Sequence, residues 1–398
     1  MRSFLKPKTI AVIGASDDES KVGSALMQNL SNFKGKIIPI NPNRKMVFGL
    51  KAYDNVLNYK GKIDLVVIAI PAKFVAGVLR ECGKKNIKNV IVISAGFSEI
   101  GNSKAEEELI KIAKRYKINL LGPNCFGVFN PYNNLDTTFS MAKPRKGNMG
   151  FISQSGALWS YVADLGVGFS GFVSLGNMAG LGFNDWIEYF SKDKKTKKIV
   201  LYIEKIKHGK EFLQACKNSN KKIYVVKAGK SKEGSKAALS HTGSLATDYK
   251  IYKGMFEQAR VILCDSFFQC FGKSVKKQRI KLSKDLALIS NAGGALALIN
   301  DYLSEKNYNI KKSLDLIGTA KSKDYEKALK KAKNQAIVIL TPQSMTDVDE
   351  VAKVIIKSRK KPVCVFLGKK SVKKATSMLR KKGIKVFNSL EGFRKSLI

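Results

Sequence analysis

The stretch TIAVIGASDDESKVGSALMQNLSNF, residues 9–33, decides the fold class. Its apolar run at residues 9–13 predicts a buried strand, and this strand ends at Gly14. A polar turn follows, and residues 24–33 then carry apolar side chains at helical spacing. The stretch therefore predicts a strand, a turn and a helix in that order.

The same alternation continues along the chain as far as residue 121. Further apolar runs that predict strands lie at residues 36–40, 64–70, 89–93 and 119–121. Helix-compatible stretches at residues 72–85 and 104–117 separate the later ones. Strands that alternate with helices in this way form a parallel, doubly wound sheet, so we expect an α/β fold that begins with a Rossmann-like domain.

The rest of the chain repeats itself at an offset near 138 residues. ISQSG at residues 152–156 matches ISNAG at 289–293, and KKIYVVKAGK at 221–230 matches KKPVCVFLGK at 360–369. A constant offset predicts two modules of similar, flavodoxin-like build. With a Pro/Gly/basic linker expected at residues 143–148, the predicted domains are 1–143, 144–275 and 280–398.

Charge is the unusual feature of the composition, because 72 Lys and Arg face only 31 Asp and Glu, for a formal charge of +41. Such a field attracts polyanions and invites a nucleic-acid interpretation. The lysines, however, are spread along the chain in short pairs, without a basic tail or a nucleic-acid-binding motif. Specific nucleic-acid binding is therefore disfavoured, although a basic nucleic-acid-associated protein remains one alternative.

The cysteine pattern and the length of the apolar runs indicate in which cellular compartment to expect the protein. The six cysteines form no CxxC pair and only two histidines accompany them, so we expect no metal site. Scattered thiols fit a reducing, cytoplasmic environment. The longest apolar runs are too short to cross a bilayer, so no membrane span is expected.

The loop after the first strand, GASDDESKVG at residues 14–23, is the first candidate site. Small residues let backbone amides approach a phosphate there, and Lys21 could contact it. The loop lacks the GxGxxG spacing, and the second strand ends in NPNRK at residues 41–45 without an acid for a ribose diol. These features disfavour a nicotinamide cofactor and suit coenzyme A, which carries an extra ribose phosphate; a plain glycine turn is the alternative.

Two strand-to-helix turns, SQSGA at residues 153–157 and NAGGA at 291–295, form the second candidate. The free N–H groups and the positive dipole at a helix start favour an anion. Two such turns facing each other could hold one phosphoryl group, whereas a single one is more often only a tight cap. The predicted phosphate-binding residues are Ser153, Gln154, Ser155, Gly156, Asn291, Ala292, Gly293 and Gly294.

His241, within ALSHTGSL, is the third candidate. It stands among small and hydroxyl residues and not on an apolar helix face, which leaves the role of nucleophile or proton carrier open beside that of a surface histidine. A nucleophilic imidazole needs an acceptor that fixes its other nitrogen, and Glu204 at the end of the strand IVLYIE is our candidate. His208, among lysines, is expected to be exposed.

Taken together, these motifs resemble the α subunit of NDP-forming acyl-CoA synthetases, of the ADP-forming acetyl-CoA synthetase type and related to succinyl-CoA synthetase. The stretches that carry the resemblance are AVIGAS with KVG (11–23), INPN (40–43), VIAIPAKFV (67–75), VISAGFSEIG (92–101), LLGPNCFG (120–127), ISQSGAL (152–158), SHTGSLA (240–246), SNAGG (290–294) and ILTPQSMTD (339–347). The chain departs from that pattern at Ala295, at residues 177–180 and at residues 312–315.

The resemblance implies a CoA-binding domain followed by two succinyl-CoA-ligase modules, with His241 phosphorylated and Glu204 orienting it. The residues that it assigns to coenzyme A are Gly14, Ala15, Ser16, Lys21, Val22, Asn41, Pro42, Pro71, Ala72, Ser94, Ala95, Gly96 and Asn124.

The implied reaction interconverts acyl-CoA, phosphate and ADP with a carboxylic acid, CoA and ATP, through an acyl phosphate and phosphohistidine. ADP or ATP with Mg²⁺ would bind a separate ATP-grasp β subunit in an α₂β₂ assembly. A non-catalytic CoA-binding regulatory protein of the same fold is the alternative.

Overall fold

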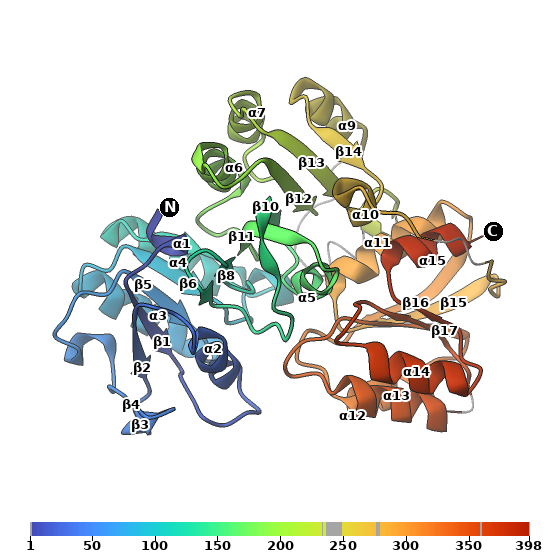
Figure 1. Ribbon diagram of the computed structural model, residues 1–398, viewed down its shortest axis with the longest axis horizontal. Coiled ribbons are helices and arrows are strands. Elements are labelled where there is room, and N and C mark those ends of the chain that lie inside the picture. Colours follow the sequence, from blue (N-terminus) through green and yellow to red (C-terminus); the bar gives the residue numbers. More distant parts are fainter. Residues whose placement is uncertain (1, 233, 236–248, 276–278, 359, 398) are drawn as a thin grey trace.

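The computed structural model describes residues 2–232, 234–235, 249–275, 279–358 and 360–397. The predicted nucleophile His241 lies outside these described residues. Three sheets, each with its own helices, form three lobes, which we call the first, second and third modules (Figure 1). The second module lies between the other two, so it can share a surface with each.

The first module has a five-stranded parallel sheet in the order β2-β1-β5-β6-β7. Its strands are β1 (Thr9–Ile13), β2 (Lys36–Ile40), β5 (Leu65–Ile68), β6 (Asn89–Val92) and β7 (Asn119–Leu121). Its helices are α2 (Val22–Leu30), α3 (Ala72–Lys84) and α4 (Ser103–Tyr116). The central strands β5 and β6 are buried along their whole length because helices cover both faces, which confirms the predicted α/β class.

Short elements complete this module. They are the hairpin of β3 (Met46–Val47) and β4 (Leu50–Lys51), and the 3₁₀ turns η1 (Val56–Asn58) and η2 (Ser98–Ile100). The N-terminal helix α1 (Arg2–Leu5) instead packs on the second module, where Phe4 meets Trp186 edge-on at 5.6 Å.

The second module has seven strands in the order β14-β13-β12-β10-β11-β8-β9. They are β8 (Val128–Asn130), β9 (Leu135–Asp136), β10 (Arg145–Ser153), β11 (Gly168–Ser174), β12 (Lys198–Ile203), β13 (Lys222–Lys227) and β14 (Ile262–Cys264). The helices are α5 (Ala157–Asp164), α6 (Phe183–Lys192), α7 (Gly209–Lys217), α9 (Tyr249–Gln258) and α10 (Phe267–Phe271).

The third module repeats this plan in the order β16-β15-β17-β18-β19. Its strands are β15 (Asp285–Ser290), β16 (Asn309–Asp315), β17 (Gln335–Leu340), β18 (Val363–Phe366) and β19 (Val386–Phe387). Its helices are α11 (Gly293–Ser304), α12 (Ser322–Lys331), α13 (Val348–Lys357), α14 (Lys373–Lys381) and α15 (Leu390–Ser396). Numbered from the first parallel strand, both modules follow the flavodoxin-like order 2-1-3-4-5, which confirms the predicted repeat.

The linker expected at residues 143–148 was a wrong prediction, because β10 begins at Arg145. The basic, glycine-containing composition misled because this end of the strand is largely exposed, and only from Met149 onward is it buried. The chain also reaches the second sheet earlier, since β8 pairs antiparallel with β11. The domain boundaries themselves remain a prediction.

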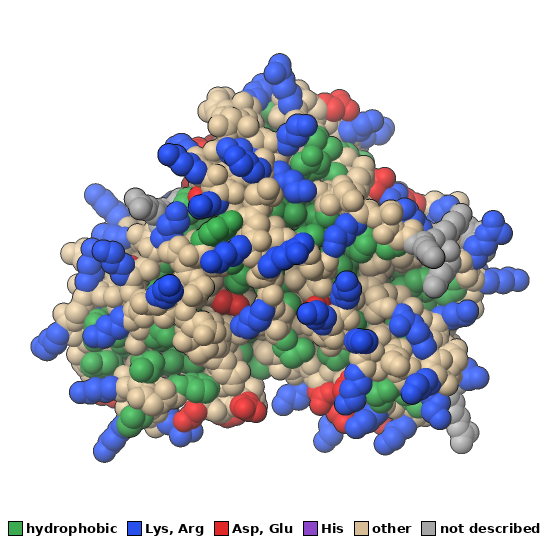
Figure 2. Space-filling view, in the orientation of Figure 1, with side chains coloured by type: hydrophobic (Ala, Val, Ile, Leu, Met, Phe, Trp, Pro, Cys, Tyr) green, Lys and Arg blue, Asp and Glu red, His purple; other side chains and the backbone are tan. Residues whose placement is uncertain are grey.

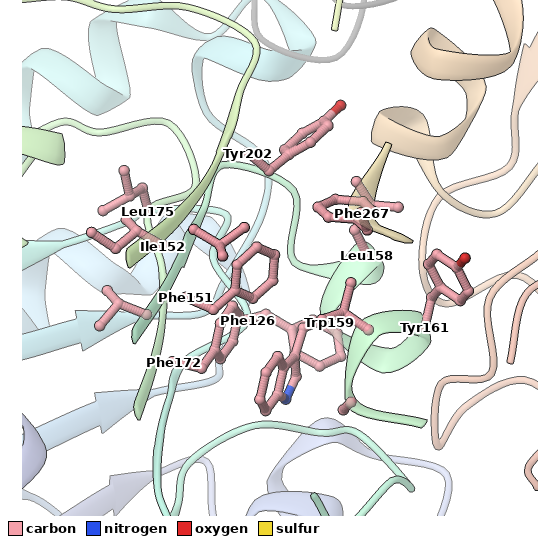
Figure 3. Packing of buried hydrophobic residues seen from close by; sticks show 14 of the residues in the cluster. Phe126, Phe151, Ile152, Leu158, Trp159, Tyr161, Phe172, Leu175, Tyr202 and Phe267 are labelled. Carbon is pink, nitrogen blue, oxygen red and sulfur yellow. The ribbon is translucent and has the colours of Figure 1, made fainter. Parts of the chain in front are cut away.

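An aromatic cluster fixes β10 and α5 in the second module (Figure 3). Trp159 on α5 stacks on Phe172 of β11 with ring centroids 4.0 Å apart, and Phe151 of β10 meets Phe267 edge-on at 5.8 Å. Each such side chain contributes about 1.5–3 kcal/mol when fully buried. The cluster therefore holds the turn between β10 and α5, where the first phosphate site is predicted.

The surface is lysine-rich over all three lobes of the face in Figure 2, with acidic side chains only in scattered places. All six cysteines are buried free thiols. None of the helices in the described ranges is long and apolar enough to cross a membrane.

Candidate active site

The two predicted phosphate turns and the loop after β1 lie where strand order reverses, between the first and third parallel strands of each sheet. These switch points separate β1 from β5, β10 from β12, and β15 from β17. In open parallel sheets, ligands bind at the carboxyl ends of the two strands beside the switch point, because the loops there diverge to opposite faces.

Gln154 links the two strands at the switch point of the second module. Its side-chain oxygen accepts hydrogen bonds from the backbone N–H of Glu204 at 2.6 Å and of Lys205 at 2.8 Å. The hydroxyl of Ser153 donates to the carbonyl of Ser155 at 2.7 Å and tightens the turn. The structure thus brings the predicted Gln154 and Glu204 together, with Gln154 oriented by backbone groups.

Asn291 does the same at the switch point of the third module. Its Oδ1 accepts from the backbone N–H of Thr341 at 2.9 Å, while its Nδ2 donates to the carbonyl of Thr341 at 2.9 Å. Ser290 accepts from the N–H of Ala292 at 3.0 Å. At each of the two switch points, an amide side chain therefore links the ends of the two neighbouring strands. The similarity of the second and third modules thus extends to their hydrogen bonds.

The two predicted phosphate turns lie against each other. A Cβ added at Gly294 would lie 2.5 Å from Cβ and 2.6 Å from Oγ of Ser155. The hydroxyl of Tyr202, at the end of β12, donates to the carbonyl of Gly294 at 3.0 Å. The starts of α5 and α11 therefore meet, and together they offer unpaired helix N–H groups to an anion.

Ser155 supplies a further donor at this contact. Its hydroxyl is fully buried and has no hydrogen-bond partner among the residues that the structure describes. A buried hydroxyl without a partner carries a desolvation cost of about 1–3 kcal/mol, which a ligand oxygen would remove.

Lys227 is a buried cation beside Glu204 that the sequence did not single out. Its ammonium donates to the carbonyl of Glu204 at 2.9 Å and to that of Ala228, and lies 4.4 Å from the ring centre of Tyr252. Burial lowers the pKa of Lys227 to about 8, against the opposing effect of the carboxylates of Asp301 and Glu204. In a chain with so many lysines, nothing in the local sequence distinguishes this one.

Of the two histidines, only His208 lies in the described part of the chain. His208 is exposed at the start of α7, as expected. The assignment of His241 as the nucleophile stays a prediction, because no described residue contact bears on it. The described chain resumes at Tyr249, the first residue of α9.

The loop after β1 packs closely against the end of β2 and the start of α2. Gly14 has a left-handed φ of 85°, and its N–H donates to the carbonyl of Ile40 at 2.9 Å. Asn41 donates from Nδ2 to the carbonyl of Ala15 at 2.8 Å. A Cβ at Gly23 would overlap the carbonyl oxygen of Gly14, so α2 begins as close to β1 as two backbones allow.

Other predicted CoA contacts gather at the same edge of the first sheet. Ser94 accepts from the N–H of Ile70 at 3.2 Å, and its carbonyl accepts from the N–H of Asn124 at 2.9 Å. A Cβ on Gly96 would lie 2.9 Å from the Cβ of Ala72. The remaining predicted contacts lie on these loops or helix starts: Ser16, Lys21, Val22, Pro42, Pro71 and Ala95. Their role toward coenzyme A remains a proposal.

Asn177 ties this edge to the second module. Its amide donates to Glu99 and to Glu106 at 2.7 Å each, and its Oδ1 accepts from Asn124 at 3.2 Å. Glu99 also accepts from the N–H of Gly96. The predicted CoA loop is thus fixed by a residue of the second module, a relation that local sequence patterns could not reveal.

No cluster of three His, Cys, Asp or Glu suited to a metal occurs within the described part of the chain.

Comparisons with known proteins agree with this architecture. Residues 8–131 match the CoA binding domain, and residues 146–273 match the succinyl-CoA ligase like flavodoxin domain. The chain is 37% identical to an ADP-forming acetate–CoA ligase I of Archaeoglobus fulgidus, over 97% of its own length and 61% of that protein. It thus spans about three fifths of that relative.

Two further relatives match over nearly their full length. The ADP-forming acetate–CoA ligase II subunit alpha of Pyrococcus furiosus is 35% identical, with 98% of this chain and 94% of that protein covered. A solved structure, the dinucleotide-forming acetyl-coenzyme A synthetase 1 of Ca. Korarchaeum cryptofilum in complex with phosphate and ADP, is 32% identical. It superposes with a TM-score of 0.66 over 99% of this chain and 95% of that one.

The fold and the switch-point geometry define a protein with one CoA-binding domain and succinyl-CoA-ligase-like flavodoxin modules. Within that class, the chain belongs to the family of α subunits of ADP-forming acetate–CoA ligases.

Proposed function

We propose that this chain is the α subunit of an NDP-forming acyl-CoA synthetase, which interconverts acyl-CoA, phosphate and ADP with a carboxylic acid, CoA and ATP. The observation that supports it most is the contact between Ser155 and Gly294, because two helix starts then face one anion position close to Glu204. The solved relative that holds phosphate and ADP supports the same chemistry.

The first step joins phosphate to the acyl group. An oxygen of inorganic phosphate attacks the thioester carbonyl, the C–S bond breaks, and the products are an acyl phosphate and CoA thiol. The N–H groups at the starts of α5 and α11, with the hydroxyl of Ser155, would offset the charge on the phosphoryl oxygens. The first module would hold CoA so that its sulfur reaches this position.

The second step moves the phosphoryl group to the protein. A nitrogen of His241 attacks phosphorus and releases the carboxylate, while Glu204 holds the proton on the other nitrogen. ADP bound to an ATP-grasp β subunit with Mg²⁺ then takes the phosphoryl group and leaves as ATP. The relative named subunit alpha supports a separate partner, and we propose an α₂β₂ assembly in the cytoplasm, where the six free thiols stay reduced.

Phosphohistidine formation tests this proposal directly. The purified chain is incubated with an ATP-grasp β subunit, Mg²⁺ and γ-³²P-ATP, and we expect acid-labile, base-stable label that is discharged by carboxylic acid plus CoA. Label that forms and discharges supports the cycle. A chain that stays unlabelled beside a partner active with another α subunit would contradict it and favour a CoA-binding regulatory protein.

Replacing Gly294, a residue of the third module, with alanine should slow the labelling of histidine. The added methyl would collide with Ser155, push the two helix starts apart and cost about 1–3 kcal/mol in the free energy of unfolding. We expect slower labelling together with a lower melting temperature. Gly254→Ala on α9 is the matched control, because nothing lies within 4 Å of its added Cβ; equal labelling rates in the two variants would refute the role of the contact.

A further inference from the structure

Asp301 reaches from the third module into the second. It lies on α11, its side chain is 1% exposed, and its two oxygens bind the turn that follows β13. Oδ2 accepts from the N–H of Gly229 at 2.8 Å, while Oδ1 accepts from the N–H of Ser231 at 2.9 Å and from its hydroxyl at 2.8 Å. Three donors of one module thus converge on one carboxylate of another.

The turn that Asp301 binds is closely built. Gly229 has a left-handed φ of 77°, and its carbonyl accepts from the hydroxyl of Ser235 at 2.9 Å. The hydroxyl of Ser231 in turn accepts from the N–H of Gly234 at 2.9 Å. A Cβ at Gly234 would overlap Oδ1 of Asp301, so the carboxylate fits against the backbone itself.

The same carboxylate acts on Lys227, at the end of β13. Burial disfavours the ammonium charge of Lys227, and Asp301 is the group that counters this most strongly by raising its pKa, followed by Glu204. The ammonium binds the carbonyl of Glu204 at 2.9 Å. Lys227 and Asp301 also line the same pocket, so Asp301 supports, through Lys227, the strand end that presents Glu204.

A second group of ions lies farther out on this interface. Arg394 approaches Asp265 at 3.3 Å and Glu305 at 3.6 Å, and Lys230 approaches Asp265 at 3.5 Å. The carboxylates of Asp265 and Glu305 are 56% and 45% exposed, so water screens these pairs and each contributes little. They supply a control at the same interface.

We infer that Asp301 is a positioning residue for phosphoryl transfer: from outside the second module it fixes the 229–231 turn and supports Lys227, which binds the main-chain carbonyl of Glu204. This inference rests on the proposed function, in which Glu204 orients the histidine. It also gives the third module a task beyond its anion-binding turn, since the module then helps to fix the main chain from which Glu204 projects.

Asp301→Asn tests the inference. Asparagine keeps the size of the side chain but replaces one acceptor oxygen with an NH₂ group. That group cannot accept from an N–H, so the hydrogen bonds made by one of the two carboxylate oxygens are lost. We expect the single-turnover rate of histidine labelling to fall at least about tenfold, because small misplacements of catalytic groups have effects of that order or larger. Affinity for CoA should not change, since the predicted CoA contacts lie in the first module.

The controls separate the possible outcomes. Glu305→Gln should label at the wild-type rate. Ser231→Ala removes one of the three hydrogen bonds to Asp301, together with the bond from the N–H of Gly234, and should slow labelling less than Asp301→Asn. If Asp301→Asn does not fold, Ser231→Ala carries the test alone. A folded Asp301→Asn protein that labels at the wild-type rate would overturn the inference. Where Asp301→Asn does not fold, a wild-type labelling rate in Ser231→Ala would overturn it. Equal slowing by Glu305→Gln would overturn it as well. Absence of label on the wild-type chain would instead contradict the proposed function.

Discussion

His241→Ala is expected to remove the phosphorylated intermediate altogether. Without the imidazole the acyl phosphate has no acceptor on the protein, so no label should form and turnover should fall by at least about 10³-fold. CoA affinity should persist, because the loops assigned to CoA belong to the first module. The measurement is turnover with the β subunit, alongside calorimetric titration of CoA.

The composition makes this experiment unusually clear. The chain has two histidines, so acid-labile, base-stable label on a histidine of this chain can lie only on His241 or on His208. His208→Ala is the matched control: the residue is exposed at the start of α7, and its removal should leave both label and turnover at wild-type levels. Wild-type turnover in His241→Ala would disprove the mechanism, and label lost only in His208→Ala would move the nucleophile to that residue.

Buried strands were predictable because their environment is uniform. Residues 9–13 and 119–121 are β1 and β7 with the predicted bounds, since sheets covered on both faces require continuous apolar runs. The repeat was predictable for a related reason: similar strand ends at Ser153 and Ser290 occupy equivalent positions in two sheets of the same order.

Pairings between distant segments were not predictable. Strands β8 and β9 have three and two residues, too few for a periodic pattern, and their place in the second sheet depends on β11. The exposed beginning of β10 resembles a linker for the same reason: its extended backbone is set by pairing with β11, and its side chains face water.

Site residues divide along the same line. The positions of Gln154 and Asn291 at the switch points were predictable, because both residues stand at strand ends beside glycine and serine; their role toward phosphate stays a prediction. Lys227 and Asp301 could not be found, because their importance comes from burial and from contacts between modules. Burial at an interface leaves no local signature in a chain that carries 72 Lys and Arg.

The positive charge acquires a physical meaning in this setting. Phosphate, ADP, ATP and CoA are all polyanions, and a chain of formal charge +41 would raise their local concentration and their rate of encounter. The spread of lysines over every lobe in Figure 2 agrees with a general field of this kind.

Gly23→Ala should have the largest effect on the first module. The added methyl would overlap the carbonyl oxygen of Gly14 and lie 2.9 Å from its carbonyl carbon. Gly14 cannot move aside, because its N–H is bound to Ile40 and its own Cα faces the carbonyl of Ala69. Since backbone must shift, we expect the free energy of unfolding to fall by about 1–3 kcal/mol and CoA affinity to drop with it.

Gly77→Ala is the control for that substitution. Gly77 is an exposed residue of α3 with nothing within 4 Å of its added Cβ, so alanine should stabilise this helix by about 0.5–1 kcal/mol and leave CoA binding intact. Thermal unfolding and CoA titration measure both effects. Labelling of His241 from ATP needs no CoA, so a folded Gly23→Ala protein should still be phosphorylated but should need more CoA to convert acid and the bound phosphoryl group into acyl-CoA and phosphate. Equal CoA affinity in the two variants would show that the loop after β1 does not form the CoA site.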